Sequence, residues 1–105
     1  MQYCNNAKGG KSTSTKREDA MIKQLYKAFL SLETLEECEN FMHDICTVAE
    51  VHAISQRLEV AKLLEKGHTY EEIEKITGAS TATISRIKRY LNHGKDGYKT
   101  VLKRI

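Results

Sequence analysis

Apolar residues recur at intervals of three and four positions along most of this chain, the spacing that gathers them on one face of an α-helix. No stretch shows the strict alternation of apolar and polar residues that predicts a half-buried strand. We therefore predict an all-α protein of about six helices joined by short connectors. The first apolar series is Ile22, Leu25, Tyr26, Phe29 and Leu32, and the last is Tyr98, Val101, Leu102 and Ile105.

Helix starts are marked by a Thr followed three residues later by a Glu, a pair that can cap a helix by exchanging side-chain and backbone hydrogen bonds. These capping boxes begin at Thr34, Thr47 and Thr69. Ser80 is placed as a further N-cap, and Gly67 and Gly78 as helix ends, because glycine readily adopts the left-handed conformation that closes many helices. The helix after Thr47 is expected to face inward with Val51, Ile54, Leu58, Ala61 and Leu64.

Residues 1–17 differ from the rest of the chain, because they are rich in Gly, Ser, Thr, Asn and Lys and show no apolar period. A segment of this composition cannot bury enough apolar surface to fold by itself. We therefore expect a flexible N-terminal arm over residues 1–17 and one helical domain over residues 18–105.

The composition is that of a globular chain, since 40% of the 105 residues are hydrophobic and 30% are charged. No apolar stretch approaches the roughly 20 residues that a membrane-spanning helix needs. No apolar run follows the N-terminus as it would in a secretory signal. The three cysteines lack the spacing of a disulfide framework and are expected to be reduced thiols. These observations predict a cytoplasmic protein that does not contact a membrane.

Charge is distributed unevenly along the chain. Residues 33–59 carry seven acidic residues and one basic residue, whereas residues 86–105 carry seven basic residues and one acidic residue. The net charge of +3 therefore conceals a basic C-terminal fifth. This asymmetry favours a polyanion as the partner of the C-terminal part.

Residues 69–91 have the pattern of a helix-turn-helix unit, in which two short helices are joined by a turn that contains glycine. Gly78 supplies the backbone freedom that a sharp turn requires. Ile73 and Ile76 of the first helix are expected to pack against Ile84 and Ile87 of the second. The other face of the second helix then remains available to a partner.

That free face carries small, hydroxyl-bearing and cationic side chains. Small groups allow close approach to a DNA groove, hydroxyls bond to phosphates or bases, and Arg binds guanine or phosphate. An ordinary helical hairpin with a solvated face is the alternative, and would make the protein an interaction module with a vestigial DNA-binding face. The candidate DNA-binding residues are Ser80, Thr81, Ala82, Thr83, Ser85, Arg86, Lys88 and Arg89.

The stretch from Thr47 to Leu91 resembles the tryptophan repressor family, and more closely its repressor-related branch called YerC/YecD. The resemblance is carried by Arg57 within SQRLEVAKLLEKG, by Gly67, and by GASTATISR from Gly78 to Arg86. It implies an intertwined homodimer that places two recognition helices in successive major grooves of double-stranded DNA. It also implies a transcriptional regulator, most simply a repressor on a palindromic operator.

The resemblance also implies a possible effector pocket made by Thr47, Arg57, Arg86 and Ile87. In the tryptophan-binding members the position of Ile87 holds a Gly that leaves room for the indole ring. Filling that space with a side chain costs several kcal/mol unless the backbone moves. We therefore predict that L-tryptophan is not the co-repressor, and leave open a different small effector or none. The alternative for Arg57 is a surface ion pair with Glu50 or Glu59.

Other chemistry is not indicated by the sequence. His43 and Cys46 are spaced to share one helix face, with Cys38 two turns earlier, and three such residues could hold a metal ion. Cys38 also fits the apolar face of its helix, where a free Cys commonly behaves as a small hydrophobe. No nucleophile–base pattern or pair of carboxylates suggests catalysis. We predict no metal, no cofactor and no enzymatic activity.

Overall fold

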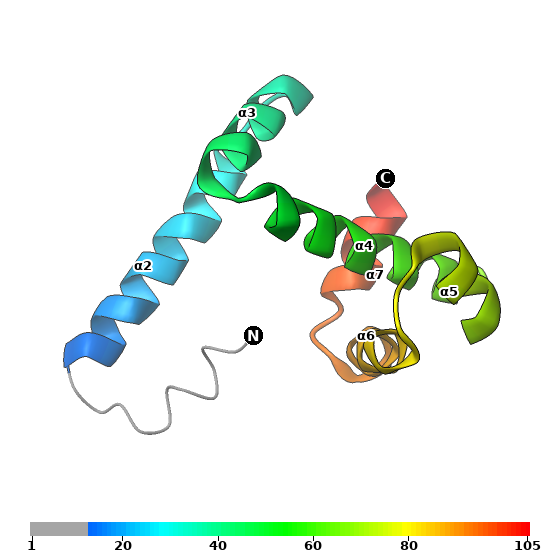
Figure 1. Cartoon of the computed structure of the whole chain (residues 1–105). Helices are drawn as coiled ribbons and strands as arrows, with labels where there is room; N and C mark the ends of the chain where they lie inside the picture. Colours follow the sequence, from blue (N-terminus) through cyan, green and yellow to red (C-terminus); the bar gives the residue numbers. More distant parts are fainter. Residues whose placement is uncertain (1–12) are drawn as a thin grey trace. The chain divides into compact units, whose positions relative to one another are not determined.

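The computed structural model describes residues 13–105, and within them the chain forms six α-helices and no strand. The all-α prediction is therefore confirmed, as is the predicted number of helices. In chain order the helices are α2 (Thr13–Leu30), α3 (Leu35–Ile45), α4 (Val48–Glu65), α5 (Tyr70–Thr77), α6 (Thr81–His93) and α7 (Gly97–Arg104) (Figure 1).

Helix α2 begins more than one turn before the expected start at Glu18, so residues 13–17 of the predicted arm are helical. The apolar period marks only the helical turns that bury a face, and a helix can extend beyond them through exposed polar residues. No Gly or Pro between Thr13 and Glu18 interrupts it. The rest of the predicted arm, residues 1–12, lies outside the described residues.

The capping boxes at Thr47 and Thr69 form as predicted, with the Thr hydroxyl accepting from the Glu N–H and the Glu carboxylate accepting from the Thr N–H. Ser80 also caps α6, by accepting from the N–H of Thr83. At Thr34 the hydroxyl accepts from the N–H of Glu37 at 3.0 Å, but the Glu37 carboxylate accepts from the N–H of Glu33 at 2.9 Å. The Glu37 carboxylate therefore binds the N–H one residue before the one that a capping box at Thr34 would use.

The predicted glycine ends of α4 and α5 are confirmed. Gly67 follows α4 with a φ of 89°, and the N–H of His68 reaches back to the carbonyl of Leu63 at 3.1 Å, which is the closing bond of a Schellman motif. Gly78 ends α5 with a φ of 76°, and its N–H bonds to the carbonyl of Glu74 at 2.8 Å. Both positions therefore need a backbone conformation that side chains disfavour.

The chain divides into two compact units, one up to Ile45 and one from Cys46 to Ile105. In the first unit, Phe29 of α2 meets Phe41 of α3 edge to face, with ring centroids 5.3 Å apart. No side chain between Thr15 and Ile45 is fully buried, and Met21 is 59% exposed. These helices thus present apolar faces that nothing within their own unit covers.

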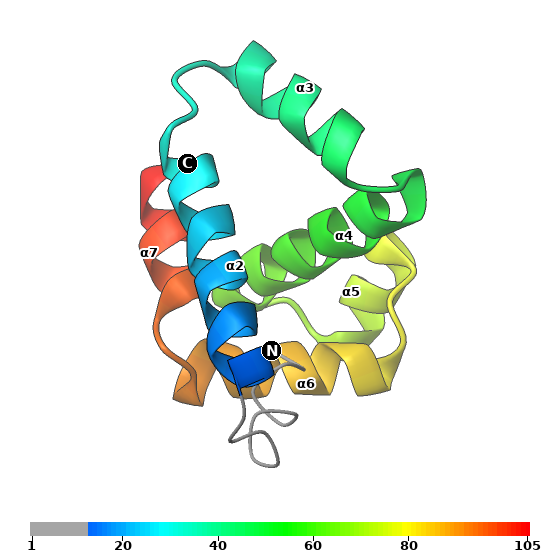
Figure 2. The same cartoon turned by 90° about the vertical axis from the view of Figure 1, so that its left-hand side faces the viewer.

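The second unit holds the buried core. Helix α4 contacts α5, α6 and α7, and α6 also contacts both α5 and α7. Figure 2 shows α6 lying lengthwise across the foot of this unit, with α4 above it. The core therefore fixes the helix-turn-helix against α4. Its buried members are Val60, Ala61, Leu63, Ile73, Ala79, Ile84 and Ile87, with Leu64, Tyr70, Tyr98 and Leu102 packed against them.

Two expected core residues prove to be exposed. Ile76 is 57% exposed and does not join Ile73 in the core, because an eight-residue helix turns only one narrow face toward its neighbours. Ile54 is 47% exposed, since the buried part of α4 is its C-terminal half, around Val60. The expected contacts of Ile73, Ile84 and Ile87 are present.

Candidate nucleic-acid interface

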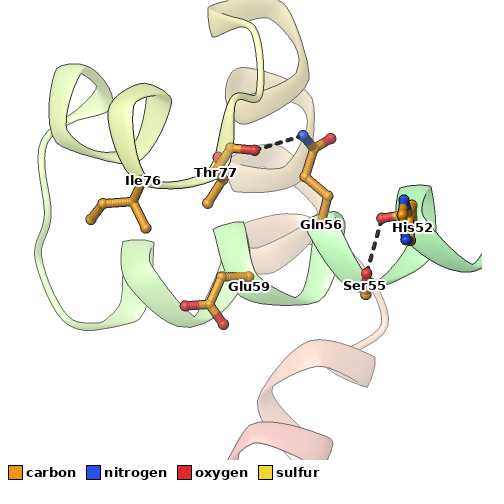
Figure 3. A pocket seen from close by; sticks show the side chains of 6 residues that line it. All are labelled: His52, Ser55, Gln56, Glu59, Ile76 and Thr77. Atoms are coloured by element: carbon orange, nitrogen blue, oxygen red, sulfur yellow. Dashed lines mark hydrogen bonds between the residues drawn. The ribbon is translucent and has the colours of Figure 1, made fainter.

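The turn between α5 and α6 is held by Thr77, whose hydroxyl donates to the carbonyl of Ile73 at 2.7 Å and accepts from the N–H of Ala79 at 3.1 Å. Gln56 of α4 adds a hydrogen bond from a neighbouring helix, since its side-chain amide donates to the carbonyl of Thr77 at 3.0 Å (Figure 3). The turn is therefore rigidly joined to α4. Neither Thr77 nor Gln56 was singled out from the sequence.

Helix α6 has one buried and one exposed side. Ile84, Ile87 and Leu91 are at most 5% exposed and face the core. Seven of the eight candidate DNA-binding residues are exposed, and Thr83 is half-buried because its hydroxyl accepts from Ser80 within the cap. The structure thus presents the candidate residues on one accessible helix, and their contact with DNA stays a prediction.

Tyr70 lies along one flank of α6. It is the first residue of α5, and its hydroxyl lies 3.5 Å from the hydroxyl of Ser85. The ammonium of Lys88 stands 5.8 Å from the centre of the same ring, within reach of a cation–π interaction. Sequence reasoning missed Tyr70. The sequence feature that could have indicated Tyr70 is its position directly after the Thr69 cap. A side chain there lies beside the second helix of the helix-turn-helix.

Tyr98 of α7 is half-buried and packs against the core cluster. Burial raises the pKa of Tyr98 above 10.0, and the positive charges of Arg57 and Arg86 partly oppose that shift. In the described part of the chain, Arg57 has no ion pair with Glu50 or Glu59, the alternative considered for it.

The residues of the possible effector pocket fall into different environments. Arg57 and Arg86 are exposed, and their positive charges both lower the pKa of Tyr98. Ile87, in contrast, is 3% exposed and belongs to the core. Thr47 caps α4 ten residues before Arg57, which places it about 15 Å away along the helix. Within one chain, Thr47 therefore lies apart from Arg57.

An open pocket lies elsewhere on this unit, between α4 and the end of α5 (Figure 3). None of the possible effector residues lines it. The pocket lies where α4 meets the end of α5, beside the exposed Ile76 and the hydrogen bond from Gln56 to Thr77. The lining residues are His52, Ser55, Gln56, Glu59, Ile76 and Thr77.

Basic side chains cover the two C-terminal helices and the turn between them. All seven basic residues after Ser85 are exposed. An exposed cluster of one sign attracts a polyanion and makes its binding dependent on salt. The residues are Arg86, Lys88, Arg89, Lys95, Lys99, Lys103 and Arg104.

No other chemistry stands out within residues 13–105. No group of three His, Cys, Asp or Glu residues there could hold a metal ion, and His43 instead lies 3.0 Å from the carboxylate of Asp44. Cys38 and Cys46 are free thiols and half-buried. None of the described helices combines the length and apolar character needed to cross a membrane.

Comparison with known proteins gives consistent matches over this helical region. A family model described as Trp repressor protein matches residues 20–105. The chain is 54% identical over 84 residues to the uncharacterized protein YerC of Bacillus subtilis (strain 168), covering 80% of this chain and 81% of that protein. A TrpR-like protein from Eubacterium eligens ATCC 27750 is 50% identical, with a TM-score of 0.78 over 81% of this chain and 88% of that one. A candidate Trp repressor from Staphylococcus aureus is 52% identical, with a TM-score of 0.77 over 81% of this chain and 85% of that one.

Proposed function

This chain belongs to the Trp repressor family, and we propose that it acts as a sequence-specific transcriptional repressor that binds its operator as a homodimer. The family is one of DNA-binding regulators without enzymatic activity. A protein with this role acts where bacterial DNA lies, so we expect it in the cytoplasm. The observation that carries the proposal is that α6 buries one side through Ile84 and Ile87 and exposes cationic side chains on the other.

Recognition would proceed through α6 in the major groove. Ala82 is small enough for close approach, Ser85 can bond to a base or phosphate, and Arg86 and Arg89 can bind guanine or the backbone. Lys99 and Lys103 on α7 are exposed cations suited to phosphate. Base contacts would then supply specificity, while the lysines would supply affinity that is independent of sequence.

Dimerisation is supported by the apolar faces of the first unit. Helices of this length are marginal in water unless tertiary packing covers an apolar face. Leu30 is 86% and Leu35 is 76% exposed within a single chain. A second copy would cover such faces, and its two-fold symmetry would require a roughly palindromic operator with half-sites about 10 base pairs apart.

The core supports the proposal that L-tryptophan is not the co-repressor. Ile87 is 3% exposed and packs with Ile73 and Ile84, so no space remains beside it for an indole ring. Entry of the ring would require overpacking of this core or a displacement of α6. We expect calorimetric titration with L-tryptophan to give no binding at millimolar concentration.

The test of the proposed function is a selection from genomic fragments. Purified protein is mixed with sheared DNA of its source at near-physiological salt, and the retained fragments are sequenced. We expect a shared inverted repeat. Retention without a shared motif would leave only electrostatic binding, and early elution from heparin at low salt would favour a protein-interaction module in which the α6 face is vestigial.

Variants separate specificity from general affinity. Arg86→Ala and Ser85→Ala are expected to change base preference, whereas Lys99→Ala and Lys103→Ala are expected to weaken binding equally on all sequences. Selection of randomised duplexes by each variant measures both effects. Equal losses on every sequence for all four variants would contradict specific recognition by α6.

A further inference from the structure

Helix α4 holds the helix-turn-helix by apolar packing only over its C-terminal half. Val60 and Ala61 are fully buried and lie in the same cluster as Ile73 of α5 and Ile84 of α6. Toward the N-terminus of α4 this packing ends, since Ile54 is 47% exposed. Apolar contacts are not directional, so a single apolar centre leaves packed helices some freedom to turn against each other.

The last turn of α5 lacks such packing against α4. Ile76 is 57% exposed, and the open pocket lies on that flank, with Glu59 of α4 on its other side (Figure 3). Thr77, the final residue of α5, is half-buried. Its carbonyl is one of those that a helix leaves without an internal partner at its C-terminal end. Apolar packing therefore does not fix this end of α5.

The side chain of Gln56 supplies the missing partner. Its amide donates to the Thr77 carbonyl at 3.0 Å, across 21 positions of the sequence. Gln56 is itself half-buried, and the Thr77 hydroxyl bonds in turn to the carbonyl of Ile73 and the N–H of Ala79. A hydrogen bond is directional, and a shielded carbonyl left without one costs free energy. The Gln56–Thr77 bond therefore favours one orientation of the turn relative to α4.

The two kinds of contact act at different places along α4. Gln56 lies four residues before Val60, about 6 Å away along the helix axis. The apolar cluster and the Gln56–Thr77 bond thus join α4 to the helix-turn-helix at two separate points, and two points fix a direction where one would act as a pivot. Because α6 begins at Thr81, shortly after Thr77, the orientation set at the turn is passed on to α6.

We propose that Gln56 is a positioning residue, which fixes the orientation of α6 relative to α4 and thereby the separation of the two half-sites that the protein prefers in its operator. This inference rests on the proposed function and names a determinant of its specificity. The chain enters the second unit through α4, so the orientation of α6 on α4 decides how each copy meets DNA. In a two-fold dimer any rotation occurs in both copies, so its effect on the distance between the two α6 helices is doubled.

Operators with different half-site separations test this role. One base pair added between the half-sites shifts them by about 3.4 Å and rotates them by about 34°. Wild-type protein should bind such an operator at least about tenfold more weakly. Gln56→Met keeps the length of the side chain but cannot donate, and should discriminate by less than about threefold. Its base preference within a half-site should be that of the wild type. Wild-type discrimination by the folded variant would overturn the proposal.

Thr69→Ala is the matched control for a general loss of stability. It removes the hydroxyl that caps α5 but leaves the Gln56–Thr77 hydrogen bond in place. It should lower the thermal unfolding midpoint and keep the wild-type preference for one separation. Equal loss of that preference in Thr69→Ala and Gln56→Met would assign the effect to loosening of the whole unit and contradict a specific role of Gln56.

Gln56→Glu gives a readout that a merely structural role would not move. A carboxylate cannot donate to the Thr77 carbonyl, whereas a protonated carboxyl can. Burial beside a carbonyl favours the protonated form, so the preference should be lost near pH 7.5 and return as the pH falls toward about 5. The titratable groups around the same pocket are His52 and Glu59, and the wild type at each pH accounts for their effect. No return at any pH at which the wild type still binds would overturn the proposal.

Amide hydrogen exchange without DNA separates this inference from the proposed function. Gln56→Met should speed exchange at Gly78 and Ala79 by at least about tenfold and leave that of Val60 unchanged. If Gln56→Met does not fold, Gln56→Glu at neutral pH takes its place in every measurement. Faster exchange in a protein that binds no operator would reject the regulator but retain Gln56 as the residue that positions the turn. Unchanged exchange at the turn would reject that role whatever the result with DNA.

Discussion

Tyr70 lies beside two of the exposed polar residues of α6. Its hydroxyl is 3.5 Å from the hydroxyl of Ser85, and the centre of its ring is 5.8 Å from the ammonium of Lys88. Arg89 has its own aromatic neighbour in Tyr90, 5.7 Å from its guanidinium to the ring centre. Side chains held in this way lose less conformational freedom when they bind, which favours affinity.

Substitution of Tyr70 tests this orientation. Tyr70→Leu removes both the hydroxyl and the ring, and is expected to weaken operator binding by about two- to fivefold, the value of an exposed cation–π interaction. Tyr70→Phe keeps the ring beneath Lys88 and should lose less. Fluorescence anisotropy with labelled operator measures both affinities. An equal loss for the two variants would assign the whole effect to the hydroxyl and contradict the role of the ring.

Glu72 gives a pH-dependent prediction. The hydrogen bond from the Thr69 backbone N–H lowers its pKa below 4.5, with a smaller contribution from nearby His68. Because the folded-state pKa is lower than the unfolded one, the cap is fully stabilising above the unfolded value and is lost as pH falls through the folded value. Carboxyl chemical shifts followed by NMR should show this low pKa. In His68→Gln it should rise only slightly, since the backbone bond remains.

At the scale of the elements, Gly78 determines whether α5 and α6 can meet. A Cβ at this position would contact nothing within 4 Å, so Gly78→Ala should be strained only by its φ of 76°. We expect a loss of about 1 kcal/mol in the free energy of unfolding, measured with urea. Gly78→Asn should lose less, because Asn tolerates the left-handed region. Equal losses for Ala and Asn would contradict this explanation.

Helix number and most helix ends could be predicted because their signals are local. A capping box or a terminal glycine acts within four residues, and those at Thr47, Thr69, Gly67 and Gly78 form as expected. The pattern of residues 69–91 also predicted the helix-turn-helix, and the resemblance to the family added the expectation of a homodimeric repressor. Seven of the eight candidate DNA-binding residues are exposed, whereas Thr83 is half-buried, and their contact with DNA stays a prediction.

Features that depend on distant contacts could not be predicted in the same way. Apolar spacing could not reveal that Ile76 would remain exposed, since that depends on how α5 meets α4 and α6. The position of Tyr70 beside Lys88 and the hydrogen bond from Gln56 to Thr77 join residues from different helices. Such pairs arise from the packing angle of the helices, which no periodicity within one helix contains.

At the scale of the whole molecule, burial and charge are both unequal between the two units. Every fully buried residue among residues 15–105 lies in the second unit, which also carries the exposed basic residues of α6 and α7. The first unit carries exposed apolar residues and the acidic run that begins at Glu33. Under the proposed function, we therefore expect the second unit to bind DNA and the first unit to provide most of the association between copies.

A charge placed on the apolar face of α2 tests this assignment. Met21 is 59% exposed in one chain, so Met21→Glu should leave the single chain able to fold but weaken the dimer at least tenfold, since burial of an unpaired charge is strongly unfavourable. Gln24→Glu adds the same charge on the same helix at an exposed polar position and is the control. Sedimentation equilibrium measures the association. Equal dimer strength in both variants would contradict the assignment.

The separation of α6 into a buried and an exposed side has an evolutionary consequence. Ala82 and Arg89 are unconstrained by the core, so operator preference can drift among descendants of this protein while the fold persists. Ser85 is less independent, because its hydroxyl lies 3.5 Å from the hydroxyl of Tyr70, which belongs to another helix. We expect lineages that replace position 85 to replace position 70 as well, so that new DNA preferences are acquired through paired changes.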